Sequence, residues 1–379
     1  MRIKRLVVCA LVAGLAAGCA GGASAGNTIM VSTGACGTGW RHAAAGWQTF
    51  QVHNGSTGAA EADLIDPVSG AIFAEVGALG PGRTRPMRLD VGSGSYAFRC
   101  VIEDTDAITG PVVRVGGDAR GASAILPVTA NDLLGPARQY TAYVAGGLNA
   151  LAGQADALAG YVRSGDLAAA RAAWLPAHLS YERLGAAYGT FGDYDALIDG
   201  RPDGLPGGVS DPAFTGFYRV EYGLWNGQSA RELTGPADRL DRDVRALRSA
   251  FPRLEIPFLD LGLRAHEILE NALQFQLTGH DDYGSGTTLA TTAANIDGTR
   301  ELLGILHPLL AARYQDLPAV YPALDRLQGL VDAARRPGGG WTPVSQLAAA
   351  GRERLDAAAS QALEVLAPIA VIFEPRRTS

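Results

Sequence analysis

The stretch Phe214–Trp225, FTGFYRVEYGLW, places a carboxylate inside an aromatic stripe. If the stretch is a helix, one face carries Phe214, Phe217, Tyr218, Glu221, Leu224 and Trp225. A carboxylate is costly to bury among aromatic rings unless an arginine, a hydrogen-bond network or a metal compensates its charge. Two interpretations follow. Glu221 either pairs with an arginine such as Arg183 or Arg201 in a core helix, or it is a metal or catalytic carboxylate in a shaped pocket.

Helical periodicity surrounds this stretch in an alanine- and leucine-rich sequence. Prolines near several starts and glycines after several ends indicate the helix boundaries. The predicted helices are Thr129–Arg163, Leu167–Phe191, Pro212–Trp225, Pro236–Ser249, Pro257–Leu277, Leu289–Gln315, Ala319–Ala334 and Pro343–Pro368. Such helices with short connections predict antiparallel bundles. The exception is the connection 192–211, whose length is typical of a functional or disordered loop. It carries Asp193, Asp195, Asp199, Asp203 and Asp211.

Residues 28–117 show a different pattern, with short alternating runs separated by Gly, Pro, Asn and Asp. Several strands at this spacing predict a β-sandwich of about 90 residues. The expected fold is therefore multi-domain, an all-β sandwich followed by an all-α helical bundle. The expected boundaries are 28–117 for the sandwich, 118–126 for a linker and 127–379 for the helical domain.

The N-terminus is typical of an exported protein. Basic residues precede an apolar run, 6–18, that is too short to span a membrane. We expect residues 1–18 to be a signal peptide and 19–27 to be a Gly/Ala/Ser-rich tether. The run ends in LAAGC, which resembles a bacterial lipobox and implies lipid attachment to Cys19. Ala16 stands where a leucine is usual, so simple export is the alternative.

Net charge and cysteine content limit the partners and the chemistry. The net charge of -6 supplies no basic stripe to neutralise phosphates, so nucleic acid is not an expected partner. Of the four cysteines, Cys9 lies in the signal peptide and Cys19 is the expected anchor. Cys36 and Cys100 remain, in a compartment where disulfides persist. A structural bridge and a thiolate metal site are both open for this pair.

Two helices carry a histidine and a glutamate four residues apart, His178 with Glu182 and His266 with Glu270. Two ligands at this spacing can share one ion, whereas a buried His–Glu hydrogen bond is the structural alternative. Glu221 adds a third carboxylate in an apolar setting. Inward-facing Glu and His side chains build metal sites in helical bundles, and this mixture suits iron or manganese. The run HEILE is not a zincin motif, because Glu270 replaces its second histidine.

Two longer runs resemble a known family. They are WLPAHLSYERLGAAYGTFGDYDALIDGRPDGLPGGVSDPAFTGFYRVEYGLW, residues 174–225, and AHEILENALQFQLTG, residues 265–279. The chain resembles the EfeO branch of the imelysin family, whose members have an exported leader, a cupredoxin-like domain and a helical imelysin domain. The resemblance implies a periplasmic or lipid-anchored component of a bacterial iron importer. Imelysin proteins were also classified as metallopeptidases, which supplies a rival enzyme hypothesis.

The resemblance also implies site residues. The family's His-x-x-Glu signature aligns with Tyr218 and Glu221, so the glutamate is kept and the histidine is replaced. A second motif, Ser-His-Thr-Asp-Leu, aligns with residues 285–289, where Gly286 and Thr288 replace the histidine and the aspartate. Positions that match the family in the helical part are Glu182, Asp193, Asp195 and Asp199. In the first domain, the residues of a candidate accessory site for copper or iron, or of a disulfide, are Cys36, Glu61 and Cys100.

The function that the resemblance implies is iron binding, without enzymatic activity, in the cell envelope. Its candidate ligands are Glu182, Tyr218, Glu221, His178, His266, Glu270, Asp193 and Asp195. A phenolate at Tyr218 suits Fe(III), so the cargo is expected to be Fe(II) or Fe(III). The implied partners are a membrane iron permease, an exported haem peroxidase of the same system, and the membrane surface through the lipid anchor. The alternatives are a metal-dependent peptidase and a divergent envelope interaction protein with a weakened metal site.

Overall fold

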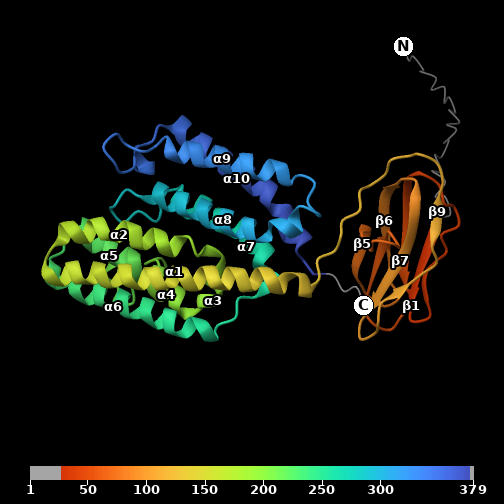
Figure 1. Cartoon of the computed structure of the whole chain (residues 1–379), viewed down its shortest axis with the longest axis horizontal. Helices are drawn as coiled ribbons and strands as arrows, with labels where there is room; N and C mark the ends of the chain where they lie inside the picture. The colour runs from red at the N-terminus through yellow and green to blue at the C-terminus, as the bar shows by residue number, and fades with distance from the viewer. Residues whose placement is uncertain (1–26, 376–379) are drawn as a thin grey trace, which may run out of the picture. The chain divides into compact units, whose positions relative to one another are not determined.

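A computed structural model describes residues 27–375, in which strands come first and helices follow (Figure 1). This order confirms the predicted fold class, an all-β part followed by an all-α part. The strands form one compact unit, up to Pro67 and again from Phe73 to Ser123, and Val68–Ile72 groups with the helices from Ala124 onward. The predicted signal peptide, the tether before Asn27 and the lipid attachment at Cys19 lie outside the described residues.

Two sheets build the strand unit, because alternating side chains give each strand one apolar face. The strand order is β2-β1-β3-β6 in one sheet and β5-β4-β7-β8 in the other, with β9 paired to β7. The strands are β1 (Asn27–Ser32), β2 (Ala35–Thr38), β3 (Gly46–Asn54), β4 (Ala60–Ile65), β5 (Ile72–Leu79), β6 (Thr84–Val91), β7 (Gly94–Ile102), β8 (Ile108–Thr109) and β9 (Val113–Val115). In β3, Phe50 and Val52 are buried and Trp47 is exposed, as the alternation requires.

A disulfide between Cys36 on β2 and Cys100 on β7 links the two sheets. Both cysteines are buried in the apolar core of the strand unit. The sequence leaves a structural bridge and a thiolate metal site open for this pair, and the structure contains the bridge. Neither sulfur is then a thiolate that could hold a metal.

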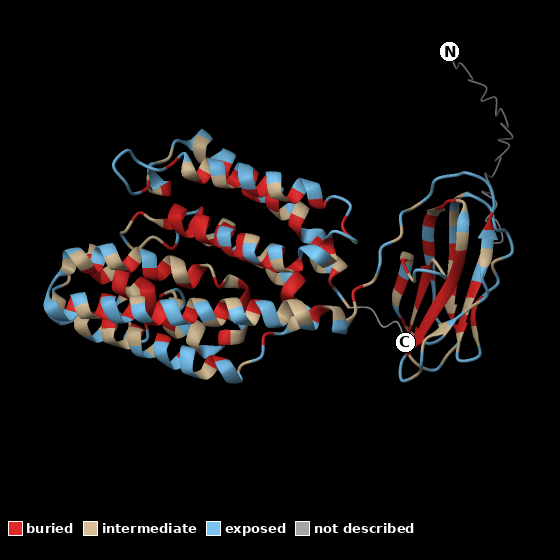
Figure 2. Ribbon diagram, viewed as in Figure 1, coloured by how far each residue is buried: buried red, intermediate tan, exposed pale blue. Residues whose placement is uncertain are grey.

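The helical unit contains the long helix α1, which packs against α2 and α6, and a second group in which α7 and α9 pack against α10 (Figure 1). The helices are α1 (Ala130–Ser164), α2 (Leu167–Glu182), α3 (Tyr188–Phe191), α4 (Asp193–Asp199), α5 (Gly216–Trp225), α6 (Ala230–Ala250), α7 (Leu261–Asn271), α8 (Thr288–Leu310), α9 (Leu317–Asp332) and α10 (Ala349–Ile372). Capping boxes at Thr129 and Ser229 begin α1 and α6. Buried residues line the facing sides of the helices (Figure 2).

The predicted helix Leu167–Phe191 is broken, because α2 ends at Glu182 and a 3₁₀ turn follows. At the break α8 crosses closely: a Cβ on Gly298 would lie 2.6 Å from the carbonyl oxygen of Arg183. Tyrosine hydroxyls compensate carbonyls next to the break, since Tyr140 donates to Leu184 and Tyr143 to Arg183, both at 3.4 Å. The break turns the chain toward α4 and the rest of the candidate site.

The connection 192–211 was predicted to be a loop, and this is wrong for Asp193–Asp199, which forms α4. Asp193 and Asp195 lie in its first turn, where carboxylates interact favourably with the helix dipole.

The predicted helix Pro257–Leu277 is not a single regular α-helix in the structure. Its regular part is α7, and Ala272–Gln276 then forms a π-helical turn, a feature that is frequent at functional sites.

One helix between residues 27 and 375, α10, is long and apolar enough to cross a membrane by length and composition alone. It packs against α7 and α9. Its buried residues are Leu355, Ala358, Ala359, Ala362, Leu366 and Ile369. Packing inside the bundle therefore accounts for the apolar residues on this buried face of the helix.

Candidate metal site in the helical unit

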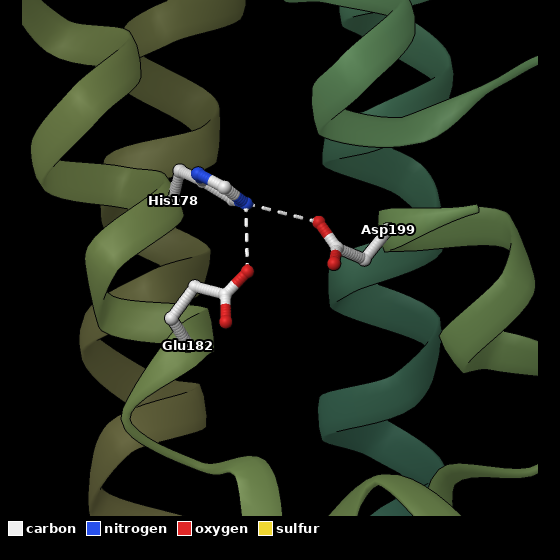
Figure 3. Close-up of side chains that lie close together, drawn as sticks. All are labelled: His178, Glu182 and Asp199. Carbon is white, nitrogen blue, oxygen red and sulfur yellow. Dashed lines mark hydrogen bonds and ion pairs between the residues drawn. The ribbon is translucent and has the colours of Figure 1, made fainter. Parts of the chain in front are cut away.

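His178, Glu182 and Asp199 converge at one buried point between α2 and α4 (Figure 3). The Nε2 atom of His178 lies 3.0 Å from Oε1 of Glu182 and 3.1 Å from Oδ1 of Asp199. The side chains of His178 and Glu182 are almost wholly buried, and that of Asp199 is 11% exposed. The i, i+4 spacing puts His178 and Glu182 on one face of α2, whereas Asp199 is the last residue of α4.

Aromatic rings hold the His178 imidazole in place. Its ring centroid lies 4.9 Å from that of Trp174, 5.2 Å from Phe217 and 5.3 Å from Tyr218. Trp174 is itself fixed, because its indole N–H donates to the carbonyl of Phe217 at 2.9 Å. The aromatic stripe of α5 therefore contributes the wall of the imidazole pocket.

The end of α4 is held by the residues that begin α5. The Thr215 hydroxyl donates to the carbonyl of Leu197 at 3.0 Å. Gly216 has a φ of 83°, and a Cβ there would lie 2.2 Å from the carbonyl oxygen of Ile198. Only glycine combines this backbone conformation with so close an approach. These contacts fix the position of Asp199, the next residue of α4.

The cluster is electrostatically unbalanced. Burial opposes a charge on His178, but the hydrogen bond and charge of Asp199 and the carboxylate of Glu182 raise its pKa to about 10. Burial and the neighbouring Glu182 charge raise the pKa of Asp199 to about 7. Burial also opposes the charge on Glu182, yet its interactions with His178 lower its pKa. Two carboxylates thus share one cation.

One oxygen of Glu182 has only His178 as a polar neighbour. Oε1 of Glu182 lies 3.0 Å from His178 Nε2, which is also hydrogen-bonded to Asp199, and it has no other hydrogen-bond donor among the described residues. The other oxygen, Oε2, accepts from Asn295 Nδ2 at 2.7 Å and from the Tyr188 hydroxyl at 3.3 Å. The carboxylate is therefore held by one oxygen and presents the other to the cluster. A cation fits at such an oxygen.

A cavity of about 140 Å³ adjoins the cluster and is lined by Glu182, Asp199 and also Asp195. Burial raises the pKa of Asp195, whose Oδ1 accepts from the Tyr181 hydroxyl at 2.5 Å. The lining arginines are both engaged, Arg201 by Asp281 and Arg264 by Asp260 and Glu267. The three carboxylates Glu182, Asp195 and Asp199 thus share the charge of His178 with that of Arg201, which is itself paired with Asp281. This donor set fits a cation with oxygen and imidazole ligands.

Tyr218 and Glu221, predicted as metal residues, are not part of this cluster. Glu221 is buried and its Oε1 accepts from the backbone N–H groups of Tyr283 and Ser285 at 3.2 and 3.0 Å. Burial raises its pKa to about 7. No arginine among residues 27–375 forms an ion pair with it, because Arg201 pairs with Asp281 and Arg183 with Asp297. Backbone hydrogen bonds therefore hold one oxygen of this carboxylate, whereas Oε2 accepts no hydrogen bond from residues 27–375.

The Tyr218 hydroxyl instead donates to Oδ2 of Asp281 at 3.3 Å. Asp281 also receives two hydrogen bonds from Arg201, at 2.7 and 2.8 Å, and one from Gln276 at 3.0 Å. Gly286 lies in the adjacent loop, where its N–H donates to Asp282 at 2.9 Å. These contacts tie the segment after α7 to α5 beside the candidate site.

The second predicted pair lies apart from the cavity lining. His266 Nδ1 and Glu270 Oε2 are 3.6 Å apart on α7, with side chains 23% and 46% exposed. Asp193 is exposed at the start of α4. The sequence pattern therefore marks two similar His–Glu pairs, and among residues 27–375 only the α2 pair lies together with a third candidate ligand.

Glu61 does not meet the two cysteines. Ala62 is the register partner of Cys100, so the alternation of β4 turns Glu61 to the opposite face of the sheet. Glu61 instead lies with Asp63 and Glu75, whose carboxylate oxygens are within 4.8 Å of one another. Asp63 there pairs with Arg99 at 2.7 Å.

Three residues of the site were missed as ligands or ligand supports. Asp199 was singled out as an aspartate of the connection 192–211 and as a position that matches the family, but it was not among the candidate ligands. Asn295 is an amide within a run of small and apolar residues, TLATTAANI, and this is the signal of a buried polar role. Gln276 had no such signal, because its position depends on the π-helical turn.

A helical bundle with inward-facing histidine and carboxylate side chains is a fold that builds metal sites. The family model for imelysin matches residues 136–368. The chain is 30% identical over 266 residues to the iron uptake system component EfeO of Yersinia pseudotuberculosis serotype I (strain IP32953), covering 70% of this chain and 69% of that protein. It is 27% identical over 328 residues to the protein of the same name from Escherichia coli O157:H7, covering 86% and 85%. The chain therefore belongs to the imelysin family, in its EfeO-type branch.

Proposed function

We propose that this protein binds iron as the cargo of an iron uptake system, through His178, Glu182 and Asp199, with Asp195 beside them. One observation carries the proposal: three ligand atoms from α2 and α4 lie within 4.8 Å of one another in a buried site. The choice of iron is supported by the name of the relatives, which are iron uptake system components. Carboxylate oxygens and an imidazole nitrogen are suitable ligands for it.

The role of each side chain follows from its surroundings. The aromatic rings fix the His178 imidazole, so its Nε2 can serve as a ligand once its proton leaves. Asn295 and Tyr188 hold one oxygen of Glu182 and leave Oε1 for the ion. Asp199 supplies a carboxylate from a second helix, so that binding also joins α2 to α4. Such supporting hydrogen bonds orient ligands and raise affinity.

We further propose that the protein is exported, held at the membrane through Cys19, and delivers iron to a membrane permease, with an exported haem peroxidase in the same system. The relatives' name as components of a system supports partners in general.

The rival function is a metal-dependent peptidase. A hydrolase of this kind needs an open metal position and a general base. Chelator-sensitive cleavage of a peptide mixture, lost in Glu182→Gln, would favour it. Copper is left out of the proposal because Cys36 and Cys100 are bridged and Glu61 faces away.

Iron titration of the full chain, by calorimetry or absorbance, tests the proposal. Fe(II) is added without oxygen, and Fe(III) is added as its citrate complex. We expect Glu182→Gln and His178→Ala each to weaken binding by at least about tenfold, since each removes a ligand. The matched controls are Glu270→Gln and His266→Ala, which alter the same residue types at the same spacing outside the cavity. Equal losses in the controls, or unchanged binding in the site variants, would contradict the proposal.

A further inference from the structure

The cavity beside the cluster is lined by two buried amide side chains whose oxygens have no hydrogen-bond donor among the described residues. The inference drawn from them rests on the proposed function. Gln276 and Asn295 are each 4% exposed, and both line the cavity together with Glu182 and Asp199. Oε1 of Gln276 and Oδ1 of Asn295 accept no hydrogen bond from any residue in the described part of the chain. Buried acceptors of this kind carry an energetic penalty until a donor or a cation reaches them.

The orientation of both amides is fixed by their nitrogen atoms. Asn295 Nδ2 donates to Glu182 Oε2 at 2.7 Å, and Gln276 Nε2 donates to Asp281 Oδ2 at 3.0 Å. Flipping either amide would place its oxygen against a carboxylate oxygen, which is repulsive. The carbonyl oxygens are therefore the atoms left without donors. Whatever occupies the cavity must offer them hydrogen atoms or positive charge.

The cavity has room for an ion together with several water ligands. Its volume is about 140 Å³, whereas a water molecule takes about 30 Å³ of liquid volume. Three protein ligands on a six-coordinate cation leave about three positions for water. Three waters require about 90 Å³, so the ion and its waters fit together.

We propose that the site holds its cargo as a six-coordinate cation that keeps about three water ligands, and that Gln276 and Asn295 accept hydrogen bonds from those waters. Water bound to a cation is a strong donor, and amide oxygens are matching neutral acceptors. Gln276 and Asn295 thereby determine metal specificity without touching the metal. They raise the affinity of the site for ions that retain water ligands.

This arrangement selects against zinc. Zinc is mostly four-coordinate in proteins, so with three protein ligands it keeps one water and uses fewer of the acceptors. Divalent manganese and iron take six ligands readily, although the general affinity order places both below zinc. The water-accepting amides therefore reduce the affinity advantage of zinc over Fe(II) and Mn(II).

Competition between Mn²⁺ and Zn²⁺ on the full chain tests the proposal, with Mn²⁺ as an air-stable substitute for Fe(II). Gln276→Met keeps the side-chain length and removes the amide. We expect it to lower Mn²⁺ affinity by about tenfold and Zn²⁺ affinity by less than about threefold. Gln274→Met is the matched control: it makes the same substitution two residues earlier in the π-helical turn, at an exposed side chain that does not line the cavity. Its Mn²⁺/Zn²⁺ affinity ratio should equal that of the wild type. A wild-type ratio in Gln276→Met, or the same shift in both variants, overturns the proposal.

Water-proton relaxation by Mn²⁺ bound to the wild-type protein gives a second readout that needs no variant. We expect about three inner-sphere waters, and a count of one or none overturns the proposal. His178→Ala separates this inference from the proposed function. If Mn²⁺ binds as tightly to His178→Ala as to the wild type, the proposed function fails and the inference fails with it. If His178→Ala loses Mn²⁺ but Gln276→Met keeps the wild-type ratio, only the water-accepting role fails.

Discussion

Nε2 of His178 and Oδ1 of Asp199 lie 3.1 Å apart, although the residues are 21 positions apart in sequence and belong to different helices. The contact exists because α2 ends at Glu182 and the chain turns back through α3 into α4. It brings a third ligand to a His–Glu pair that the helical spacing alone assembles. The candidate iron site is therefore a product of the turn as well as of the α2 sequence.

The position of Asp199 depends on Gly216, so Gly216→Ala should weaken iron binding. The added Cβ would lie 2.2 Å from the carbonyl oxygen of Ile198, at a φ that disfavours alanine. We expect a loss of about 1–3 kcal/mol in the free energy of unfolding and a lower iron affinity, because α4 must shift. Gly153→Ala is the control, since a Cβ there has open space in α1. It should raise stability by about 0.5–1 kcal/mol and leave iron affinity unchanged, as denaturant unfolding and iron titration would show.

Iron binding should release protons and strengthen with pH. The pKa of His178 is raised to about 10 by Asp199 and Glu182 against the cost of burial, so the free site holds the Nε2 proton near neutral pH. A metal requires that nitrogen without its proton. Affinity should therefore rise by roughly tenfold per pH unit for each proton released, between about pH 6 and about pH 8. Calorimetry in buffers of different ionisation enthalpy counts the protons. Affinity that is flat or falls with pH would contradict the assignment of His178.

Glu221→Gln should stabilise the protein at high pH. Burial raises the pKa of Glu221 to about 7 from an ordinary value of 4.5, so the folded state holds this proton more tightly than the unfolded state. Its contribution to stability is present below the ordinary pKa and is lost as the pH rises through about 7. Glutamine keeps an oxygen for the N–H groups of Tyr283 and Ser285. We expect a gain of about 2–3 kcal/mol near pH 8 and less than about 1 kcal/mol near pH 5.

Denaturant unfolding at the two pH values measures this difference. The iron affinity of Glu221→Gln should stay close to that of the wild type, because Glu221 is held by backbone N–H groups outside the cluster. A variant that is less stable at both pH values would show that the charge is favourable where it lies. A large loss of iron affinity would instead identify Glu221 as a ligand.

Reduction of the Cys36–Cys100 disulfide should destabilise the strand unit and leave iron binding in place. The bridge spans 64 residues, and a cross-link over a loop of this size stabilises by roughly 4 kcal/mol in the chain-entropy model. The cluster lies wholly in the helical unit. Cys36→Ala/Cys100→Ala should therefore lower the unfolding midpoint and retain the wild-type iron affinity. Loss of iron binding in this variant would place the main site among the strands.

Much of this architecture could be predicted from the sequence because it depends on short-range periodicity. Alternation predicted the sheets, and the i, i+4 spacing of His178 and Glu182 predicted two ligands on one face. The same spacing marked His266 and Glu270, and local pattern has no means to show that this second pair faces solvent. The position of Asp199, the π-helical turn at Gln276 and the compensation of Glu221 depend on tertiary crossings. Only the folded chain specifies these.

The location of bound iron is the most direct test of the central claim. A crystal structure of the iron-loaded full chain, with anomalous scattering measured at the iron absorption edge, would locate the ion independently of any variant. The account predicts a peak between His178 Nε2, Glu182 Oε1 and Asp199 Oδ1. A peak at Glu221, at His266 and Glu270, or among the strands, with none between α2 and α4, would contradict it.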